Sequence, residues 1–303
     1  MSFTSTVKNE ISKQEFNEAG NISLLSAIIS NSTIDENVIK ITTENASVAR
    51  YVFNLIKLLY LITPKVTVRK GYNYNKKLLY IIEVTNKVSQ ILIDTGLKDG
   101  IIPKNFIVDD IEIMRYYLKG VFLLSGSIND PKTSRYHLEF VVSTKEYAIF
   151  LTDLLNNFYL NSKYLKHENR YMVYVKEAEK IGDFLRIINA TTSLFYFEDI
   201  RIYRDHKNMT NRLNNCEQAN VDKTILAATK ELEDIKIIES IGGLDLLDDK
   251  VREVAIYRKK YPDTSLQELS DIISIETGNK ITKSGLHHRL NKIKELASRL
   301  RNN

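Results

Sequence analysis

Apolar residues along this 303-residue chain follow two different spacings. Within residues 46–60, Val48, Val52 and Ile56 recur every four positions, which is typical of a helix with one buried face. Within 170–175, bulky and polar residues alternate beside a polar turn, which is typical of a strand. The chain up to about residue 190 is therefore predicted to be an α+β structure.

One further helical segment, residues 117–130, carries Gly120 in its middle and Gly126 near its end. A glycine inside a helix costs about 1 kcal/mol relative to alanine. Such a cost is justified where two helix backbones approach more closely than a Cβ atom allows. The segment 25–33 aligns with this helix without gaps, 93 residues earlier, and places Ala27 at the position of Gly120. These two helices are predicted to pack together.

The elements that follow each helix also repeat in kind and order. The first series covers 38–43, 46–60, 65–69, 77–84 and 87–95, and the second covers 136–143, 145–159, 162–166, 170–175 and 178–188. The repeat indicates an internal duplication of an αββαββα unit. We therefore expect two pseudo-symmetric lobes that meet along the two small-residue helices.

The C-terminal stretch has the start and stop signals of several short helices. Ser265 followed by Glu268 has the spacing of a capping box, and Thr282 is a candidate N-cap for the last helix. In that helix an apolar face is formed by Leu286, Leu290, Ile293, Ala297 and Leu300. The connection between the two helices, 274–281, is longer than the turn of three or four residues usual in helix-turn-helix units.

Charge concentrates at this end of the chain. Residues 279–303 contain seven Lys or Arg and one Glu, a net charge of +6, whereas the whole chain carries +5. A basic helix can be a merely solvated face, but here its polar side carries residue types that contact base edges and phosphates. The candidate DNA contacts are Ser265, Gln267, Thr282, Lys283, Ser284, His287, His288, Arg289, Asn291, Lys292, Lys294 and Arg299.

Composition excludes several other classes of protein. Cys216 is the only cysteine, so an intrachain disulfide is impossible, and no apolar run has the length of a membrane span. His287 and His288 lack acidic or cysteine companions at metal-ligand spacing. There is no glycine-rich phosphate loop or catalytic triad. We expect a cytoplasmic protein, associated with the nucleoid, with no cofactor and no metal.

Four segments resemble the WhiA family of bacterial DNA-binding regulators, and the resemblance covers essentially the full length. They are MSFTSTVKNEI, YLKGVFLLSGSINDPKTSRYHLEF, FEDIRIYRDHKNMTNRLNNCEQANVDKT and TKSGLHHRLNKI. LKGVFLLSG is similar to the LAGLIDADG helix of homing endonucleases. The resemblance implies two LAGLIDADG lobes followed by an all-α helix-turn-helix domain, and roles in cell division and chromosome segregation.

The expected organisation has five parts. They are an N-terminal segment 1–19, lobe 1 at 20–100, lobe 2 at 101–190, a linker and connecting helix at 191–248, and the helix-turn-helix domain at 249–303. The N-terminal segment is predicted to form a helix packed loosely on the first lobe. Within the linker, a helix is predicted from 221 to 238.

Further DNA contacts are open to two interpretations. Arg201, Arg204 and Arg212 either grip phosphates or pair with the acidic residues that alternate with them. The basic turns in 70–77 and 163–177 either touch a phosphate backbone or are solvated hairpin tips.

The resemblance also bears on catalysis. LAGLIDADG nucleases hold divalent cations with one acidic residue at the end of each central helix, and here the matching positions are Ser32 and Ser125. Serine lacks the negative charge that such a site needs. Asp35 and Asp130 lie nearby and are expected to cap turns. No catalytic residue is therefore expected.

The predicted function is a non-catalytic transcription regulator that binds double-stranded DNA. One alternative is a scaffold whose body binds a protein or ligand while only the tail binds DNA, and another is a residual endonuclease. The candidate protein partner is RNA polymerase or a division or segregation protein, and we expect a monomer.

Overall fold

The computed structural model describes residues 2–15, 17–35, 37–70, 78–133 and 135–301. The chain forms two compact units, residues 1–204 and residues 205–303. We call them the body and the tail and describe each by itself. None of the described helices is long and apolar enough to cross a membrane.

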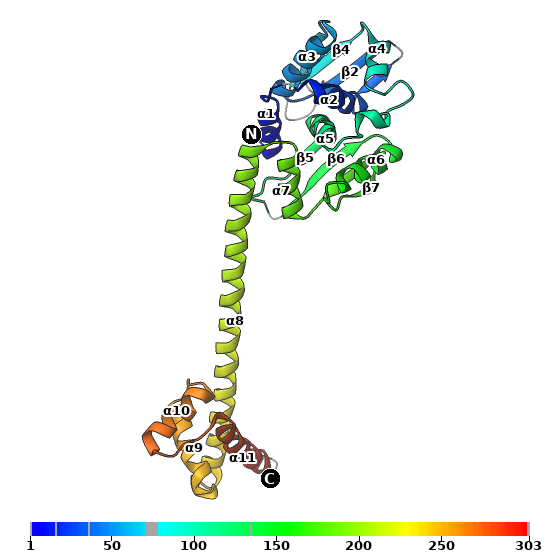
Figure 1. Cartoon of the computed structure of the whole chain (residues 1–303). Coiled ribbons are helices and arrows are strands. Elements are labelled where there is room, and N and C mark those ends of the chain that lie inside the picture. Colours follow the sequence, from blue (N-terminus) through cyan, green and yellow to red (C-terminus); the bar gives the residue numbers. More distant parts are fainter. Residues whose placement is uncertain (1, 16, 36, 71–77, 134, 302–303) are drawn as a thin grey trace. The chain divides into compact units, whose positions relative to one another are not determined.

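The body begins with lobe 1, which alternates helices and strands (Figure 1). Its elements are α2 (Glu18–Ser30), β1 (Thr33–Asp35), β2 (Val38–Thr43), α3 (Ala46–Tyr60), β3 (Lys65–Lys70), β4 (Leu78–Val84) and α4 (Val88–Asp94). The strands form one antiparallel sheet in the order β1-β2-β4-β3.

Lobe 2 repeats this arrangement after a short 3₁₀ helix, η1 (Asn105–Ile107). Its elements are α5 (Ile111–Ser125), β5 (Gly126–Ile128), β6 (Leu138–Val142), α6 (Lys145–Asn156), β7 (Lys163–His167), β8 (Arg170–Val175) and α7 (Ala178–Ile187). The sheet is again antiparallel, in the equivalent order β5-β6-β8-β7. The predicted duplication of an αββαββα unit is confirmed.

The lobes meet where α2 and α5 pack side by side (Figure 1). An added Cβ at Gly120 would lie 2.5 Å from the carbonyl oxygen of Leu24 and 2.8 Å from the Cβ of Ala27. The close approach predicted from this glycine is confirmed. Gly126 differs, because it begins β5 with an extended backbone.

The N-terminal helix α1 (Phe3–Ile11) is part of the body's core. Its residues Phe3, Val7 and Ile11 are buried in the cluster that both lobes share. In addition, the hydroxyl of Thr4 donates to the carbonyl oxygen of Ile128 (2.8 Å) and accepts from the backbone N–H of Ile128 (2.9 Å). The prediction of a helix packed loosely on the first lobe is therefore wrong, because α1 also binds lobe 2.

A single helix, α8 (Thr191–Ile241), runs through the segment predicted to be a linker. The prediction that a helix starts at residue 221 is wrong, because no Gly or Pro interrupts residues 191–241. The Glu10 carboxylate closes its first turn, accepting from the backbone N–H groups of Thr192 (2.7 Å) and Ser193 (2.9 Å). The boundary between body and tail falls within this helix.

All regular elements that the structure describes in the tail are helices (Figure 1). After α8 come the 3₁₀ helix η2 (Leu244–Leu246), α9 (Asp249–Lys260), α10 (Leu266–Thr277) and α11 (Lys283–Arg301). Its core is a separate cluster to which α8 contributes Ile235 and Ile238. The tail's compact unit therefore includes residues that the sequence analysis assigned to the linker.

Candidate nucleic-acid interface

The start of α10 is held by the predicted capping box. The Ser265 hydroxyl accepts from the backbone N–H of Glu268 (3.2 Å), and the Glu268 carboxylate accepts from the backbone N–H of Ser265 (2.8 Å). These reciprocal bonds satisfy two backbone donors that a free helix end leaves open. The helix N-terminus at Ser265 is thus a defined structure.

The turn between α10 and α11 is shorter than predicted. It covers residues 278–282, because α10 continues to Thr277 and Gly278 ends it with a left-handed backbone (φ 71°). The hydroxyl of Ser274 accepts from the backbone N–H of Ile281 (3.0 Å), which ties the turn to α10. The expectation of a connection from 274 to 281 is therefore wrong, since the last turn of α10 lacks the apolar spacing that marks the rest of it.

The last helix, α11, has the predicted cap and the predicted buried face. The Thr282 hydroxyl accepts from the backbone N–H of Gly285 (3.1 Å). The residues that face the tail's core are Leu286, Leu290, Ile293 and Ala297, with Leu300 partly buried. The polar side of α11 is consequently turned away from the core.

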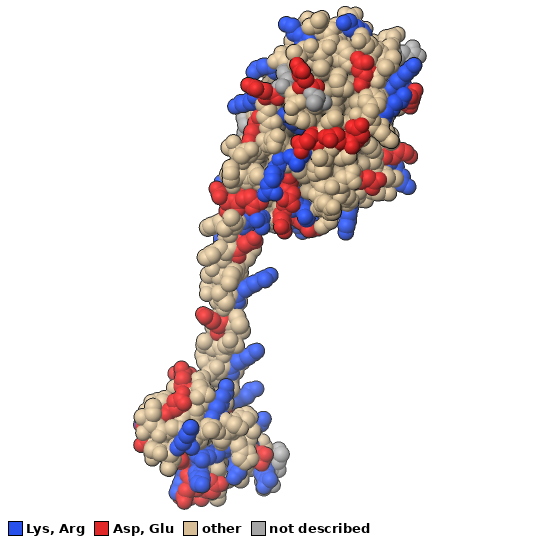
Figure 2. Space-filling view, viewed as in Figure 1, with Lys and Arg blue, Asp and Glu red and all other residues tan. Residues whose placement is uncertain are grey.

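Most of the predicted DNA contacts are exposed on this polar side and at the start of α10. The exposed ones are Gln267, Thr282, Lys283, Ser284, His287, His288, Asn291, Lys292, Lys294 and Arg299. Ser265 and Arg289 are partly buried. Figure 2 shows Lys and Arg side chains gathered on the tail, beside Asp and Glu side chains.

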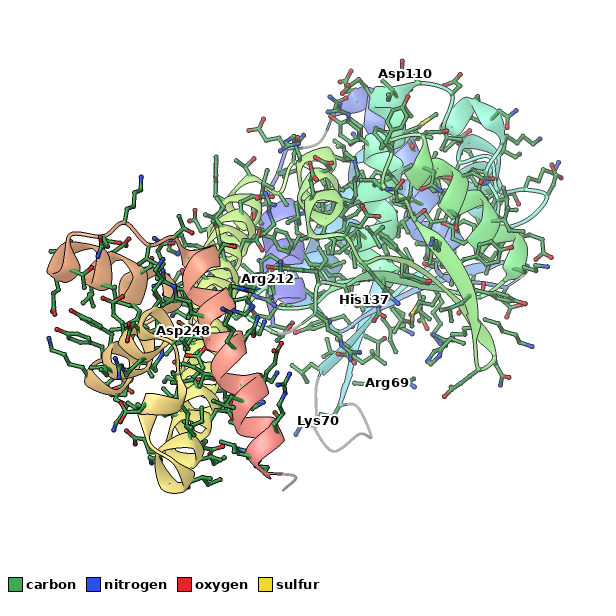
Figure 3. All side chains as sticks on the ribbon, turned by 90° about the horizontal axis from the view of Figure 1, so that it is seen from below. Arg69, Lys70, Asp110, His137, Arg212 and Asp248 are labelled. Atoms are coloured by element: carbon green, nitrogen blue, oxygen red, sulfur yellow. The ribbon has the colours of Figure 1, made fainter. Side chains whose placement is uncertain are left out.

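Neighbouring carboxylates divide these cations into two groups. Arg289 lies 3.8 Å from Glu253, and Lys292 lies 3.7 Å from Asp248, which Figure 3 labels beside α11. Lys283, by contrast, has no carboxylate within ion-pair distance in the part of the chain that the structure describes. Its charge is available to an outside partner.

A hollow in the tail brings Lys283 together with other cations. The hollow has a volume of about 240 Å³. It is lined by Lys223, Thr224 and Ala227 from α8, Arg258 from α9, Ser265, Leu266 and Gln267 at the start of α10, and Lys283 from α11. We call this set the tail hollow. A helix N-terminus flanked by lysines is an arrangement that binds phosphate.

Arg258 fixes the shape of the tail hollow. The residue is 1% exposed, and its Nη1 donates to the carbonyl oxygen of Thr264 (2.7 Å) while its Nε lies 2.8 Å from the Glu231 carboxylate. Burial raises the pKa of Glu231, and the guanidinium opposes that rise. This pairing connects α8, α9 and the start of α10.

Sequence reasoning missed Lys223 and Arg258. Lys223 lies in a polar stretch of α8 without a periodic apolar pattern, and Arg258 lies in a basic run with Lys259 and Lys260. Neither position carries a local signal that distinguishes a lining residue from a solvated one. Only the packing of four helices reveals them.

The arginines of α8 have mixed surroundings. Arg201 pairs with Glu198 (2.6 Å), and Arg204 donates to the carbonyl oxygens of Pro131 (2.7 Å) and Thr133. Both side chains therefore have partners within the body. Arg212, labelled on α8 in Figure 3, is exposed.

The hairpins of the body present exposed strands. Every residue of β7 is exposed, and the predicted strands 162–166 and 170–175 lie within a residue of the observed β7 and β8. Arg170, which begins β8 and pairs with His167 of β7, is also exposed. Residues 71–77 of the first predicted basic turn lie outside the described residues.

The two positions that match nuclease carboxylates have equivalent hydrogen bonds. The Ser32 hydroxyl donates to the carbonyl oxygen of Ile28 (2.7 Å), and the Ser125 hydroxyl donates to that of Val121 (3.0 Å). Asp130 accepts from the backbone N–H of Lys132 (2.9 Å) and so caps a turn, as expected. Among the described residues no group of three His, Cys, Asp or Glu side chains is placed to hold a metal ion.

The fold and this site define a class of protein with a duplicated LAGLIDADG-like body and a helix-turn-helix tail. Family models match in three places: the WhiA N-terminal LAGLIDADG-like domain (22–98), the WhiA LAGLIDADG-like domain (114–207) and the WhiA C-terminal HTH domain (210–297). The chain belongs to the WhiA family.

Full-length relatives agree with this assignment. The chain is 43% identical to the "Probable cell division protein WhiA" of Bacillus cytotoxicus, over 99% of this chain and 98% of the relative. It is 42% identical to the protein of the same name in Staphylococcus aureus (strain JH9), over 100% and 98%. The crystal structure of full-length DUF199/WhiA from Thermatoga maritima has a TM-score of 0.57 at 23% identity and covers 99% of both chains. That likeness shows the fold.

Proposed function

We propose that this protein is a DNA-binding transcription regulator that acts in cell division and chromosome segregation and does not cleave DNA. The observation that carries the proposal is the polar face of α11, with Lys283, which has no carboxylate partner among the described residues, at its start and the tail hollow beside it. The family's HTH domain and the name of the relatives support the same assignment.

In this proposal the first half of α11 enters the major groove, which has room for one helix. Ser284, His288 and Asn291 then face base edges. Lys223, Lys283 and the N-terminus of α10 hold a backbone phosphate and set the position of the helix. Arg258 positions these groups without touching DNA.

The absence of cleavage is proposed from the two serines. Ser32 and Ser125 supply no negative charge, and their hydroxyl protons are directed to carbonyl oxygens of their own helices. A divalent cation would lack the carboxylates that normally hold it. We therefore expect no cleavage of supercoiled plasmid in Mg²⁺ or Mn²⁺, and any single-site cut that depends on the protein would contradict this point.

The test of DNA binding uses the full-length protein and the salt dependence of its affinity for random duplex DNA. Each phosphate contact that is lost reduces the log-log slope by about 0.9, so Lys223→Gln with Lys283→Gln, which removes both lysines from one phosphate, should reduce it by about 0.9. Lys259→Gln is the control, because Lys259 belongs to the tail and already pairs with Glu239 (2.5 Å). If the double variant keeps the wild-type slope, the tail hollow does not hold phosphate.

Sequence reading is tested by selection from a random DNA library. Ser284→Ala or His288→Ala should change the selected bases while leaving the salt slope unchanged, because base contacts specify and phosphate contacts position. An unchanged selected sequence in both variants would remove α11 as the reading helix.

A second candidate function is a scaffold whose body binds a ligand or protein at the cleft beside Ser32. A hollow of about 230 Å³ supports it, and its lining includes Ser30, Ser32, Lys40 and Arg170 but no carboxylate among the described residues. Alanine at Lys283, His288 and Lys292 together separates the two functions in cells. Loss of all function favours the regulator, and retained function favours the scaffold.

The remaining assignments also belong to this proposal. We propose a monomer in the cytoplasm that associates with the nucleoid and with RNA polymerase or a division or segregation protein. Light scattering on the purified protein checks the monomer, since a dimer would double the measured mass. Fluorescence imaging of the tagged protein, with and without the alanine substitutions in α11, checks whether nucleoid association depends on DNA binding.

A further inference from the structure

A cavity of about 340 Å³ lies in the body, away from the cleft beside Ser32. We call it the α5 cavity. Its lining residues are Gln14 and Glu15 after α1, Glu112, Arg115, Tyr116 and Lys119 on one face of α5, and Ile187, Ile188 and Asn189 at the end of α7. None of these lining residues is among the candidate DNA contacts.

Lys119 is an unusual lining residue, because it is a buried lysine. It is 4% exposed, and its Nζ donates to the Oε1 of Gln14 (2.7 Å) and lies 5.4 Å from the centre of the Tyr51 ring. An ammonium group can donate three hydrogen bonds. Within the described residues it has this single acceptor and no carboxylate. Burial lowers the pKa of Lys119 to about 8, which is the expected effect on a buried cation without a counter-ion.

Arg115 provides a second cationic donor in the same wall. Its Nε is buried and makes no hydrogen bond to any described residue, although Glu112 Oε1 lies 3.4 Å away. Buried polar atoms in native proteins are nearly always hydrogen-bonded, so this donor is free to bind a group that enters the cavity. Two cationic side chains with unused donors thus line one cavity.

The rest of the lining limits the size and nature of the partner. Ile187 and Ile188 are buried and, with the half-buried Tyr116, give an apolar wall. Glu15 and Glu112 are exposed at the cavity, and because their repulsion grows with the charge of the ligand they favour an anion of low charge over a polyanion such as nucleic acid. The volume is at the lower end for sites that bind small molecules.

We propose that the α5 cavity binds a small organic anion, whose carboxylate or phosphate group is held by Lys119 and Arg115. The apolar part of the ligand lies against Tyr116 and the two isoleucines. The amide of Gln14 bridges Lys119 and the carbonyl oxygen of Asn189 (2.8 Å), so a bound anion would displace its oxygen from Lys119. This site is independent of the DNA-binding function proposed above.

The test measures thermal unfolding of the full-length protein with benzoate, phenyl phosphate, inorganic phosphate or the neutral benzyl alcohol, at constant ionic strength and without DNA. At about 10 mM, a ligand with a millimolar Kd should raise the body's Tm by about 3 to 6 °C. Benzoate or phenyl phosphate should give this shift, and the larger of the two shifts identifies the preferred anionic group. Benzyl alcohol should give none, and inorganic phosphate a smaller one.

Variants connect the shift to the cavity. Lys119→Met and Arg115→Gln should each abolish it, whereas Lys104→Gln, which alters an exposed lysine paired with Asp99 (3.2 Å), should keep it. Because Arg115 is only partly buried, its variant remains informative if Lys119→Met fails to fold. The proposal is overturned if neither aromatic anion shifts the Tm of the wild type, or if the shift persists in Arg115→Gln.

Discussion

Substituting Gly120 with alanine tests the close packing of the two central helices. In an isolated helix the change would stabilise the helix by about 1 kcal/mol, because alanine is the better helix former. Here the new methyl group would lie 2.5 Å from the Leu24 carbonyl oxygen, about 1 Å inside normal contact, and 2.8 Å from the Ala27 Cβ. Both obstacles are backbone or next to it, so they move only if α2 and α5 separate. Such overpacking costs about 1 to 3 kcal/mol or more.

We therefore expect Gly120→Ala to lower the body's stability by about 2 kcal/mol, which is roughly 4 to 8 °C in Tm for a unit of this size. Scanning calorimetry of the full-length protein measures it. The matched control is Gly285→Ala in α11, where the nearest atom to an added Cβ is the Thr282 hydroxyl at 3.3 Å. This variant should leave the tail equally stable or slightly more stable.

Adding Ala27→Gly to Gly120→Ala removes one of the two obstacles but leaves the Leu24 carbonyl in place. The double variant should therefore recover little of the lost stability. A wild-type Tm in Gly120→Ala would refute the reasoning, because it would mean that the two helices separate at no cost.

Three further substitutions are checked by urea unfolding of the full-length protein. Glu10→Ala removes the carboxylate that caps α8 and should cost the body about 1 to 2 kcal/mol, whereas an unchanged midpoint would show that water replaces the cap. Arg258→Met leaves Glu231 partly buried without its guanidinium and should cost the tail about 3 to 5 kcal/mol; Glu231→Met in the same chain should restore most of that. Without added ligand, Lys119→Met should stabilise the body by roughly 1 to 3 kcal/mol at pH 7.5. The pKa of Lys119 in the folded protein is about 8, below its ordinary value of 10.5, so wild-type stability rises with pH across that interval and the advantage of the variant should fall by pH 9.5. An advantage that stays constant with pH would contradict the burial of a charged amine.

Elements with a strong local signal are predictable from the sequence. Helix α3 and strands β2 and β8 begin and end where the spacing of apolar residues predicts them. The duplication is visible because the same series of patterns returns 93 residues later. The capping box at Ser265 and the N-cap at Thr282 were also predictable, since each involves residues only three apart.

Features that depend on distant partners were not predictable. The packing of α1 depends on Ile128, which is 124 residues beyond Thr4. Helix α8 is polar on most of its surface, so it lacks the apolar stripe from which a helix is normally inferred. The tail hollow combines side chains of four helices, and its polar residues look like ordinary solvated ones in the sequence.

The bond between Glu10 and the start of α8 has a consequence for synthesis on the ribosome. The Glu10 carboxylate cannot form this bond until Thr192, which is 182 residues further along the chain, has been synthesised. At typical rates of translation this interval is roughly 10 to 40 s. During that time Phe3 lacks the rings of Tyr196 and Phe197, which lie against it in the finished body. A nascent chain stalled before α8 should therefore leave part of the apolar face of α1 exposed to solvent.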